Sequence, residues 1–214
     1  MLLAARDPGT GEPLAADEVR DQAAGMIFGG FETTASLLFW ASYVLTLDLA
    51  EQERIRAEVR THPPDRVATL AALAQRPRLR TVVLETLRLY PPVPHLAREP
   101  LANDVIQGQP VRRGSQVWIS SWVLHRHRAH WEHVTALVPE RFVGMPSPWT
   151  SNGAYLPFGA GPRICIGAAF AMAEAQVMMA TLLARFPACT ASTPAIFTRR
   201  RTMTSQYRGS SSMP

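Results

Sequence analysis

The feature that most constrains the fold is a nearly uninterrupted apolar run from Ala23 to Leu47. Asp17 and Glu18 precede it, and acids in a first turn are typical of a helix start because they face the positive end of the helix dipole. A helix that is apolar nearly all round either spans a membrane, for which about 20 apolar residues suffice, or is buried in a large core. Because Glu32 lies in the middle of the run, we expect a buried helix and keep the membrane span as the lesser alternative.

A short polar and glycine-containing segment interrupts this apolar run. It contains Gly29, Gly30, Glu32 and Thr33. Glycine costs up to about 1 kcal/mol relative to alanine in a helix interior, and a buried carboxylate must be hydrogen-bonded or neutralised. The pattern alone leaves two interpretations open: a close helix crossing with satisfied hydroxyls, or a functional pair of an acid and a hydroxyl.

The second informative segment is Phe158–Gly167, in which glycines, a proline and an arginine surround one cysteine. Gly159 and Gly161 permit backbone angles or close approaches that a Cβ would block. Cys165 is expected at a helix start, where free N–H groups and the helix dipole favour the metal-binding thiolate. Arg163 adds a cation for an anionic ligand. Taken alone, a single cysteine is more often a small buried residue at a helix start than a metal ligand.

This segment resembles the signature of the cytochrome P-450 family of haem-thiolate monooxygenases. The matching positions are Phe158, Gly159, Gly161, Arg163, Cys165 and Gly167. The resemblance implies a mainly α fold with a small antiparallel β-sheet, and haem b (iron protoporphyrin IX) as cofactor. It implies Cys165 as the axial iron ligand and Phe158 packed near the sulfur. Arg163 would bind a haem propionate, and Gly159 and Gly167 would leave room at the cofactor.

The apolar helix also resembles a family element, the central helix over the distal face of the haem. The matching residues are Gly29, Gly30, Glu32 and Thr33. The resemblance implies that Glu32 and Thr33 are catalytic, delivering protons and positioning water. The helix face at 24–28 and the turn at 93–96 would contact the substrate.

Three further charged residues fall on family motifs. Glu85 and Arg88, which would otherwise be an exposed pair worth a few tenths of a kcal/mol, match a Glu-x-x-Arg element. Arg141 supplies the second arginine of a buried structural network. Arg98 occupies the place of a propionate-binding arginine in the family, and we favour that role over a surface arginine.

The remaining pattern predicts further helices and one small sheet. Breaks at Pro63, Pro91, Gly108, Gly114 and Pro187, together with the apolar spacing, give their bounds. Helices are expected at 48–60, 67–73, 79–90 and 168–186, and an antiparallel sheet at 105–119. Four histidines, His125, His127, His130 and His133, have a spacing that suggests a metal site, but no carboxylate or cysteine completes the set and we expect none.

Composition limits the partners and the compartment. The chain has 47% hydrophobic residues and a net charge of +5. All of its basic residues are arginine, which indicates codon bias, so we expect no nucleic-acid partner, although Arg199–Arg201 could form a local basic patch. With two cysteines and no signal peptide, a cytoplasmic location with Cys189 as a free structural thiol is expected.

The resemblance covers about residues 16–186, and it corresponds to the C-terminal part of a haem domain. We therefore expect residues 1–214 to form one such unit. The implied function is insertion of one oxygen atom from O2 into a small hydrophobic organic substrate. Because no flavin or nicotinamide motif is present, a separate ferredoxin or flavoprotein reductase would supply the electrons. The alternatives are a non-catalytic fragment, with or without haem, and a membrane protein anchored by the apolar run.

Overall fold

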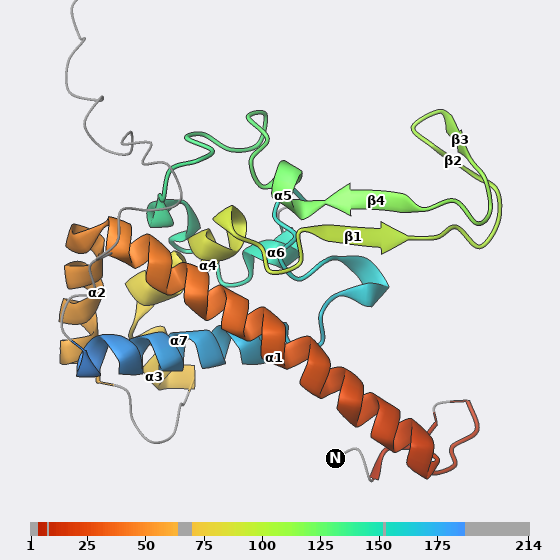
Figure 1. The fold of residues 1–214 in the computed structure, drawn as a ribbon, viewed down its shortest axis with the longest axis horizontal. Helices are drawn as coiled ribbons and strands as arrows, with labels where there is room; N and C mark the ends of the chain where they lie inside the picture. The colour runs from red at the N-terminus through yellow and green to blue at the C-terminus, as the bar shows by residue number, and fades with distance from the viewer. Residues whose placement is uncertain (1–3, 8, 64–69, 152, 187–214) are drawn as a thin grey trace, which may run out of the picture.

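The computed structural model describes residues 4–7, 9–63, 70–151 and 153–186. These residues form a mainly α-helical body with two small antiparallel strand pairs (Figure 1). In chain order the elements are α1 (Ala16–Leu47), α2 (Leu49–Thr61), α3 (Leu70–Ala74), α4 (Pro77–Leu89), β1 (His95–Arg98), β2 (Asp104–Ile106), β3 (Gln109–Val111), β4 (Val117–Ser120), α5 (Ser121–Leu124), the 3₁₀ turn η2 (Pro139–Phe142), α6 (Pro148–Ser151), the 3₁₀ turn η3 (Gly161–Arg163) and α7 (Ala168–Arg185). The expected mainly α fold with small antiparallel sheets is confirmed.

The long helix α1 begins where the acids predict, and the Glu18 carboxylate accepts a hydrogen bond from the Ala15 N–H. Its C-terminal half packs against α4 and α7 through one stripe of residues at helical spacing. The buried members of that stripe are Thr34, Leu37, Ala41, Val44 and Leu45. This half of α1 therefore belongs to the core.

The N-terminal half of α1 corrects the expectation of a helix buried on all sides. Phe28 is 80% exposed and Phe31 is 78% exposed. This half extends beyond the other helices, as Figure 1 shows, so among the described residues nothing packs around it. The apolar pattern thus predicted the helix correctly but did not predict that its N-terminal half is exposed. Within the described part of the chain no single helix meets the length and hydropathy needed to cross a membrane; α1 and α2 meet it only together, bent by 115°.

Helix α4 lies at the centre of the core. Its residues from Thr81 to Leu89 are all buried, and it packs against α1, α2, α7 and η2. The first turn of α4 is capped from another helix, because the Glu58 carboxylate accepts hydrogen bonds of 2.9 Å from the N–H groups of Arg78 and Leu79. A carboxylate at this end also faces the positive end of the helix dipole. Helices α2 and α4 are thereby held in a fixed relation.

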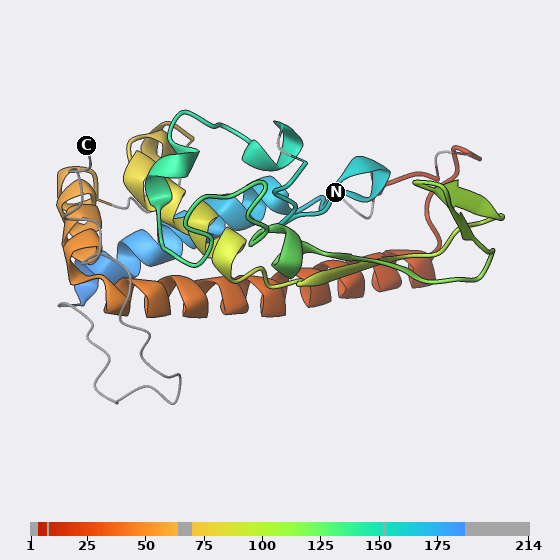
Figure 2. The same cartoon turned by 90° about the horizontal axis from the view of Figure 1, so that it is seen from above.

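The strands form two separate pairs where one sheet was expected. Strand β1 pairs with β4, with His95 opposite Ser120, and β2 pairs with β3. Gln107 and Gly108 both have positive φ, which is the geometry of a tight hairpin turn between twisted strands. The strands form an arm that extends from the helical body (Figures 1 and 2). The predicted breaks at Gly108 and Gly114 are confirmed, but β1 precedes the predicted range.

Other predicted boundaries agree with the structure to within a few residues. Helix α2 ends at Thr61, before the Pro63 that was expected to break it, and α7 ends at Arg185. Helix α3 begins at Leu70, so the first part of the helix expected at 67–73 lies outside the described residues. Cys189 and Arg199–Arg201 also lie outside them.

Candidate functional site

The loop that carries Cys165 is shaped by backbone turns. Gly159 and Gly161 have φ of 73° and 69°, values that L side chains rarely adopt, and the segment between them and the cysteine forms η3. The Cys165 N–H donates a 2.9 Å hydrogen bond to the Phe158 carbonyl, which closes the loop on itself. The Cys165 thiol is left exposed, three residues ahead of the start of α7 at Ala168. The loop therefore presents a sulfur to its surroundings at a helix N-terminus.

Two glycines of the loop are required for different reasons. Gly159 is buried, and a Cβ on it would lie 3.8 Å from the Leu96 side chain on β1, so its positive φ is the main constraint. Gly167 has an ordinary φ of −87°, but a Cβ on it would lie 3.9 Å from the Cys165 sulfur. The absence of that methyl group leaves open space directly beside the thiol.

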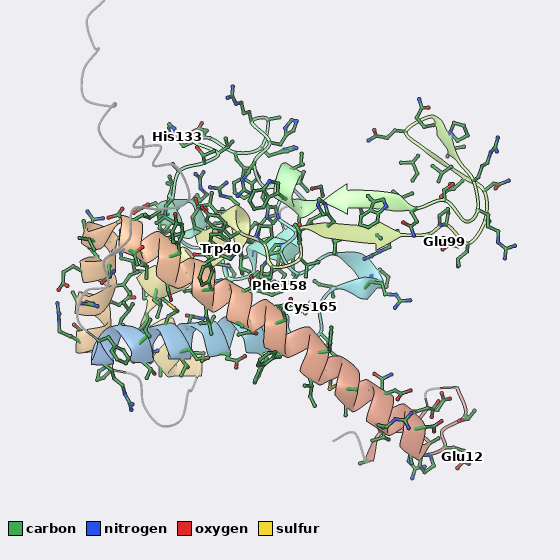
Figure 3. The ribbon with its side chains drawn as sticks, viewed as in Figure 1. Glu12, Trp40, Glu99, His133, Phe158 and Cys165 are labelled. Atoms are coloured by element: carbon green, nitrogen blue, oxygen red, sulfur yellow. The ribbon has the colours of Figure 1, made fainter. Side chains whose placement is uncertain are left out.

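Phe158 is held by an aromatic neighbour. Its ring meets the Trp149 ring edge to face, with centroids 5.1 Å apart and an interplanar angle of 75°. Phe158 also packs against the hydrophobic core. Since the Phe158 carbonyl accepts the Cys165 N–H, this packing anchors the cysteine loop as well. Figure 3 labels Phe158 and Cys165, which stand next to each other in that view.

The two predicted propionate arginines are both exposed. Arg163 belongs to η3, and among the described residues its guanidinium has no hydrogen-bond or ion-pair partner. Arg98 donates only to the carbonyl of its neighbour Ala97. Leu96 on β1 lies beside Gly159 of the loop. Arg98 follows Leu96 by two residues, so its side chain leaves the same face of the strand. Two exposed arginines without an ion-pair partner among the described residues thus flank the loop.

The acid and hydroxyl on α1 have contrasting environments. The Thr33 hydroxyl donates a 2.7 Å hydrogen bond to the Gly29 carbonyl one turn earlier. The Glu32 side chain is exposed, and it contacts no partner among the described residues. A Cβ on Gly29 or Gly30 would meet nothing within 4 Å. Among the described residues, the structure thus excludes a close helix crossing at these two glycines.

The predicted charge network is confirmed and forms the buried centre of the molecule. The Glu85 carboxylate binds Arg88 in bidentate fashion with two 2.8 Å contacts, and neither side chain is accessible. Arg141 adds a 3.2 Å contact, and the Val138 N–H donates at 3.0 Å. Arg88 in turn donates to three backbone carbonyls, those of His125, Val134 and Ala136. Every charge is paired, as a buried ionic network requires.

The four histidines between residues 125 and 133 have different surroundings. His127 and His130 are exposed and lie with ring centroids 5.5 Å apart. His125 is fully buried, and burial, together with the charge of Arg88, lowers its pKa to about 4. In the described part of the chain, no three metal-ligating side chains come together. His125 is the residue that sequence reasoning missed, because its spacing was considered only in terms of metal ligation.

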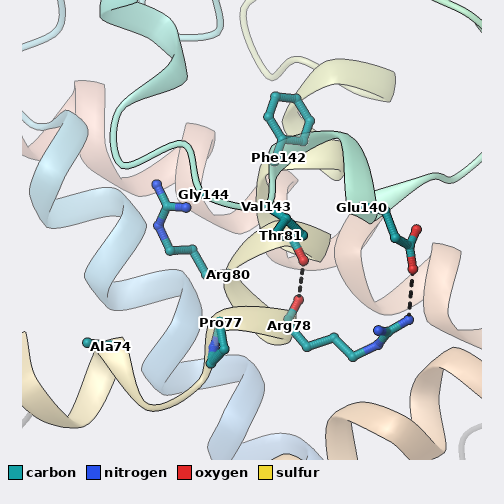
Figure 4. A pocket seen from close by; sticks show the side chains of 9 residues that line it. All are labelled: Ala74, Pro77, Arg78, Arg80, Thr81, Glu140, Phe142, Val143 and Gly144. Carbon is teal, nitrogen blue, oxygen red and sulfur yellow. Dashed lines mark hydrogen bonds and ion pairs between the residues drawn. The ribbon is translucent and has the colours of Figure 1, made fainter.

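Two cavities lie away from the cysteine loop. One of about 310 Å³ lies between the start of α4 and η2, where Arg78 contacts Glu140 at 3.1 Å (Figure 4). Another of about 460 Å³ lies beside α5 at Trp122 and Arg126. Neither is lined by a predicted cofactor or catalytic residue. The candidate site is the exposed surface around Cys165.

Comparison with known proteins decides the family. The sequence model of the family described as Cytochrome P450 matches residues 1–203. The chain belongs to the cytochrome P450 family. Among curated P450s and relatives, it is 37% identical over 180 residues to Protein LUTEIN DEFICIENT 5, chloroplastic, of Arabidopsis thaliana, which covers 83% of this chain. It is 37% identical over 191 residues to Cytochrome P450 4F8 of Homo sapiens, which covers 87% of this chain. It is 33% identical over 185 residues to Cyclooctatin synthase of Streptomyces melanosporofaciens, which covers 86%.

The chain matches only a part of each of these P450 relatives. The aligned segment covers 30% of the Arabidopsis protein, 36% of the human one and 40% of the bacterial one. The chain thus spans about a third of the length of the curated relatives that it matches. Properties of a whole P450 are therefore proposals for this chain.

P450 proteins are haem-thiolate oxidoreductases, and the residues present here fit a haem. The donor set is one exposed thiol, the ligand type that gives this class of haem protein its chemistry. The open space at Gly167 leaves the sulfur accessible from one side. Arg98 and Arg163 offer two cations without competing carboxylates, which suits a cofactor that carries two propionates.

Proposed function

We propose that this chain is the cysteine-bearing part of a P450 monooxygenase. In the complete reaction, one oxygen atom of O2 enters a small hydrophobic organic substrate and the other leaves as water, with two electrons from a separate ferredoxin or flavoprotein reductase. The cofactor is haem b. The observation that carries the proposal is the exposed Cys165 thiol at the tip of a loop closed on the Phe158 carbonyl.

Each residue of the loop has a distinct task. Cys165 would hold the haem iron through its thiolate, and Gly159 and Gly167 keep Cβ atoms away from the turn and from the sulfur. Arg98 and Arg163 bind the propionates, and Phe158 shields the ligand side from water. When bound, the haem supplies the redox chemistry by which O2 is split, and a thiolate ligand favours that cleavage.

Helix α1 provides the proton-handling groups. Thr33 has its hydroxyl hydrogen on the Gly29 carbonyl, so its oxygen lone pairs remain available to orient a water molecule. Glu32 is exposed at the next position, where its carboxyl can hold a proton and pass it to that water. The exposed apolar face at Ile27 and Phe28 supplies a contact surface for a hydrophobic substrate.

A second candidate function is haem binding without turnover. The observation that favours it is the exposure of the N-terminal half of α1. Neither of the two cavities described above is lined by that helix. A site open to water cannot exclude solvent from a reacting group, which P450-type chemistry needs. The two candidates share Cys165 as ligand and differ only in whether substrate is converted.

Thiolate ligation is tested by absorption spectroscopy of the haem-loaded chain. The reduced carbon-monoxide complex is expected to show the red-shifted Soret band of thiolate ligation, and Cys165→Ala to lose it. Cys189→Ala is the matched control, because it removes the chain's other cysteine and is expected to leave the band unchanged. A band that survives in Cys165→Ala would exclude Cys165 as the ligand.

A further inference from the structure

The buried imidazole of His125 connects two parts of the molecule that are far apart in sequence. Its Nε2 atom accepts a 2.8 Å hydrogen bond from the Leu156 N–H, and its Nδ1 atom lies 3.3 Å from the Arg88 carbonyl. A backbone N–H can only donate, so Nε2 carries no proton. Nδ1 must then carry the proton of the neutral ring and donate it to the carbonyl. The two partners therefore select one tautomer.

The surroundings of His125 keep its ring neutral. The side chain is inaccessible to water, and the guanidinium groups of Arg88 and Arg126 are the charges that act on it. Burial and these two cations act together to lower its pKa to about 4. The nearby Tyr155 ring, 5.2 Å away, contributes an apolar wall. The acceptor at Nε2 is therefore present throughout the physiological pH range.

The side connected to Arg88 is rigid. Arg88 donates back to the His125 carbonyl at 2.9 Å, so His125 is bound to it through both its backbone and its ring. Arg88 is itself held by the bidentate contact with Glu85. One end of the connection is thus the buried ionic network.

The side connected to Leu156 leads directly to the cysteine. The Leu156 carbonyl accepts the Gly159 N–H at 3.2 Å, and the Phe158 carbonyl accepts the Cys165 N–H at 2.9 Å. The preceding residue, Tyr155, is fully buried and donates from its hydroxyl to the Leu84 carbonyl of α4 at 2.7 Å. Tyr155 thus fixes the segment to α4, and the His125 ring fixes the backbone at the position from which the cysteine loop departs.

We propose that His125 is a positioning residue for the thiolate ligand, acting through the Leu156 N–H to hold the cysteine loop against the Glu85–Arg88 pair. The proposal assigns the ring a task that is neither metal ligation nor simple core filling. Its relevance to the iron rests on the proposed function, whereas the hydrogen bond to Leu156 does not.

Two substitutions separate the two ring nitrogens. Glutamine reaches as far as Nε2 and offers an amide oxygen to Leu156, whereas asparagine reaches only as far as Nδ1. In the haem-free chain, His125→Asn is expected to accelerate amide hydrogen exchange at Leu156 by about two- to tenfold, the factor that corresponds to one net hydrogen bond. His125→Gln is expected to restore most of the protection. Equal protection in the Asn variant and the parent would overturn the proposal.

The haem-loaded chain gives the second readout. His125→Asn is expected to convert part of the reduced carbon-monoxide complex to a form with the Soret band of a lost thiolate ligand, and His125→Gln to retain the parent band. An unchanged band in His125→Asn contradicts the positioning role. If the parent chain shows no thiolate band, the proposed function fails, and exchange at Leu156 alone decides the claim for His125.

A measurement on the parent protein covers the case in which His125→Asn does not fold. With ¹⁵N-labelled histidine, the nitrogen chemical shifts report which ring nitrogen carries the proton. The proposal requires a neutral ring protonated at Nδ1. A ring protonated at Nε2 could not accept from Leu156 and would overturn it.

Discussion

Glu85 and Glu32 are both acids within apolar helical segments, but the fold treats them in opposite ways. Glu85 is inaccessible and accepts hydrogen bonds from Arg88, Arg141 and the Val138 N–H. Glu32 is exposed on α1 and has no partner among the described residues. The chain itself supplies the hydrogen-bond donors for the Glu85 carboxylate, whereas the Glu32 carboxylate remains available to a ligand.

This difference indicates a structural role for Glu85 and leaves Glu32 free for the functional role that we propose. A buried carboxylate is tolerated only where donors surround it, so Glu85 is committed to holding α4, η2 and the segment at Val138 together. An exposed carboxylate without a partner contributes little to stability, so Glu32 remains available for the role toward a ligand that we propose. The predictions below test this contrast in order of expected effect.

Substitution of Glu85 is expected to have the largest effect. Glu85→Ala leaves Arg88 buried without its carboxylate, and we expect a loss of about 3–5 kcal/mol in the free energy of unfolding. Glu140→Ala is the matched control, since it removes an exposed contact with Arg78 and should cost less than about 1 kcal/mol. Urea unfolding of both variants measures the difference. Equal losses in the free energy of unfolding would show that the buried Glu85–Arg88 pair stabilises the fold no more than an exposed ion pair does.

The free energy of unfolding is also expected to decrease in acid because of His125. Its pKa is lowered to about 4 in the folded protein, below the ordinary 6.5, so the unfolded chain binds more protons between these values. The neutral His125 ring makes its full contribution to the free energy of unfolding above about pH 6.5. As the pH falls from there toward 4, that contribution is lost at about 1 kcal/mol per pH unit. His125→Gln removes this group, so its free energy of unfolding should fall less steeply over that window. An identical slope would contradict the neutral buried ring.

The cysteine loop should respond differently at its two structurally distinct glycines. Gly159→Ala forces a side chain into a φ of 73° and is expected to cost about 1–2 kcal/mol in the free energy of unfolding. Gly167→Ala has no such strain and should cost less than about 1 kcal/mol. Because its methyl group would lie near the sulfur, it should instead weaken haem uptake. Thermal unfolding and haem titration separate the two effects; the reverse order would refute the geometry of the loop.

Local pattern was enough to predict much of the fold. The acids before α1, the prolines after α2 and α4, and Gly108 gave element ends because each acts on the adjacent backbone. The Glu85, Arg88 and Arg141 trio was found because its motifs are short and specific, and the structure confirms its contacts.

Features that depend on distant segments were not predicted. The exposure of Phe28 and Phe31 depends on what surrounds α1, and an apolar pattern does not carry that information. Strands β1 and β4 pair with each other although the β2–β3 hairpin lies between them in the sequence. His125 was missed because its partners, Arg88 and Leu156, lie 37 and 31 residues away along the chain. The assignments to Cys165, Arg98, Arg163, Glu32 and Thr33 stay predictions.

The contrast between the two acids is tested most directly by turnover in a complete enzyme that carries this segment. The quantity to measure is product formed per reductant consumed. Thr33→Ala is expected to fold and bind haem like the parent, since its hydroxyl contacts only the Gly29 carbonyl, and to release hydrogen peroxide in place of product. Positioned acid–base groups contribute about 10²–10⁴-fold, so the loss should be clear. Glu32→Gln should slow turnover with less peroxide release. If Thr33→Ala remains as tightly coupled as the parent, the functional role of the α1 pair is contradicted.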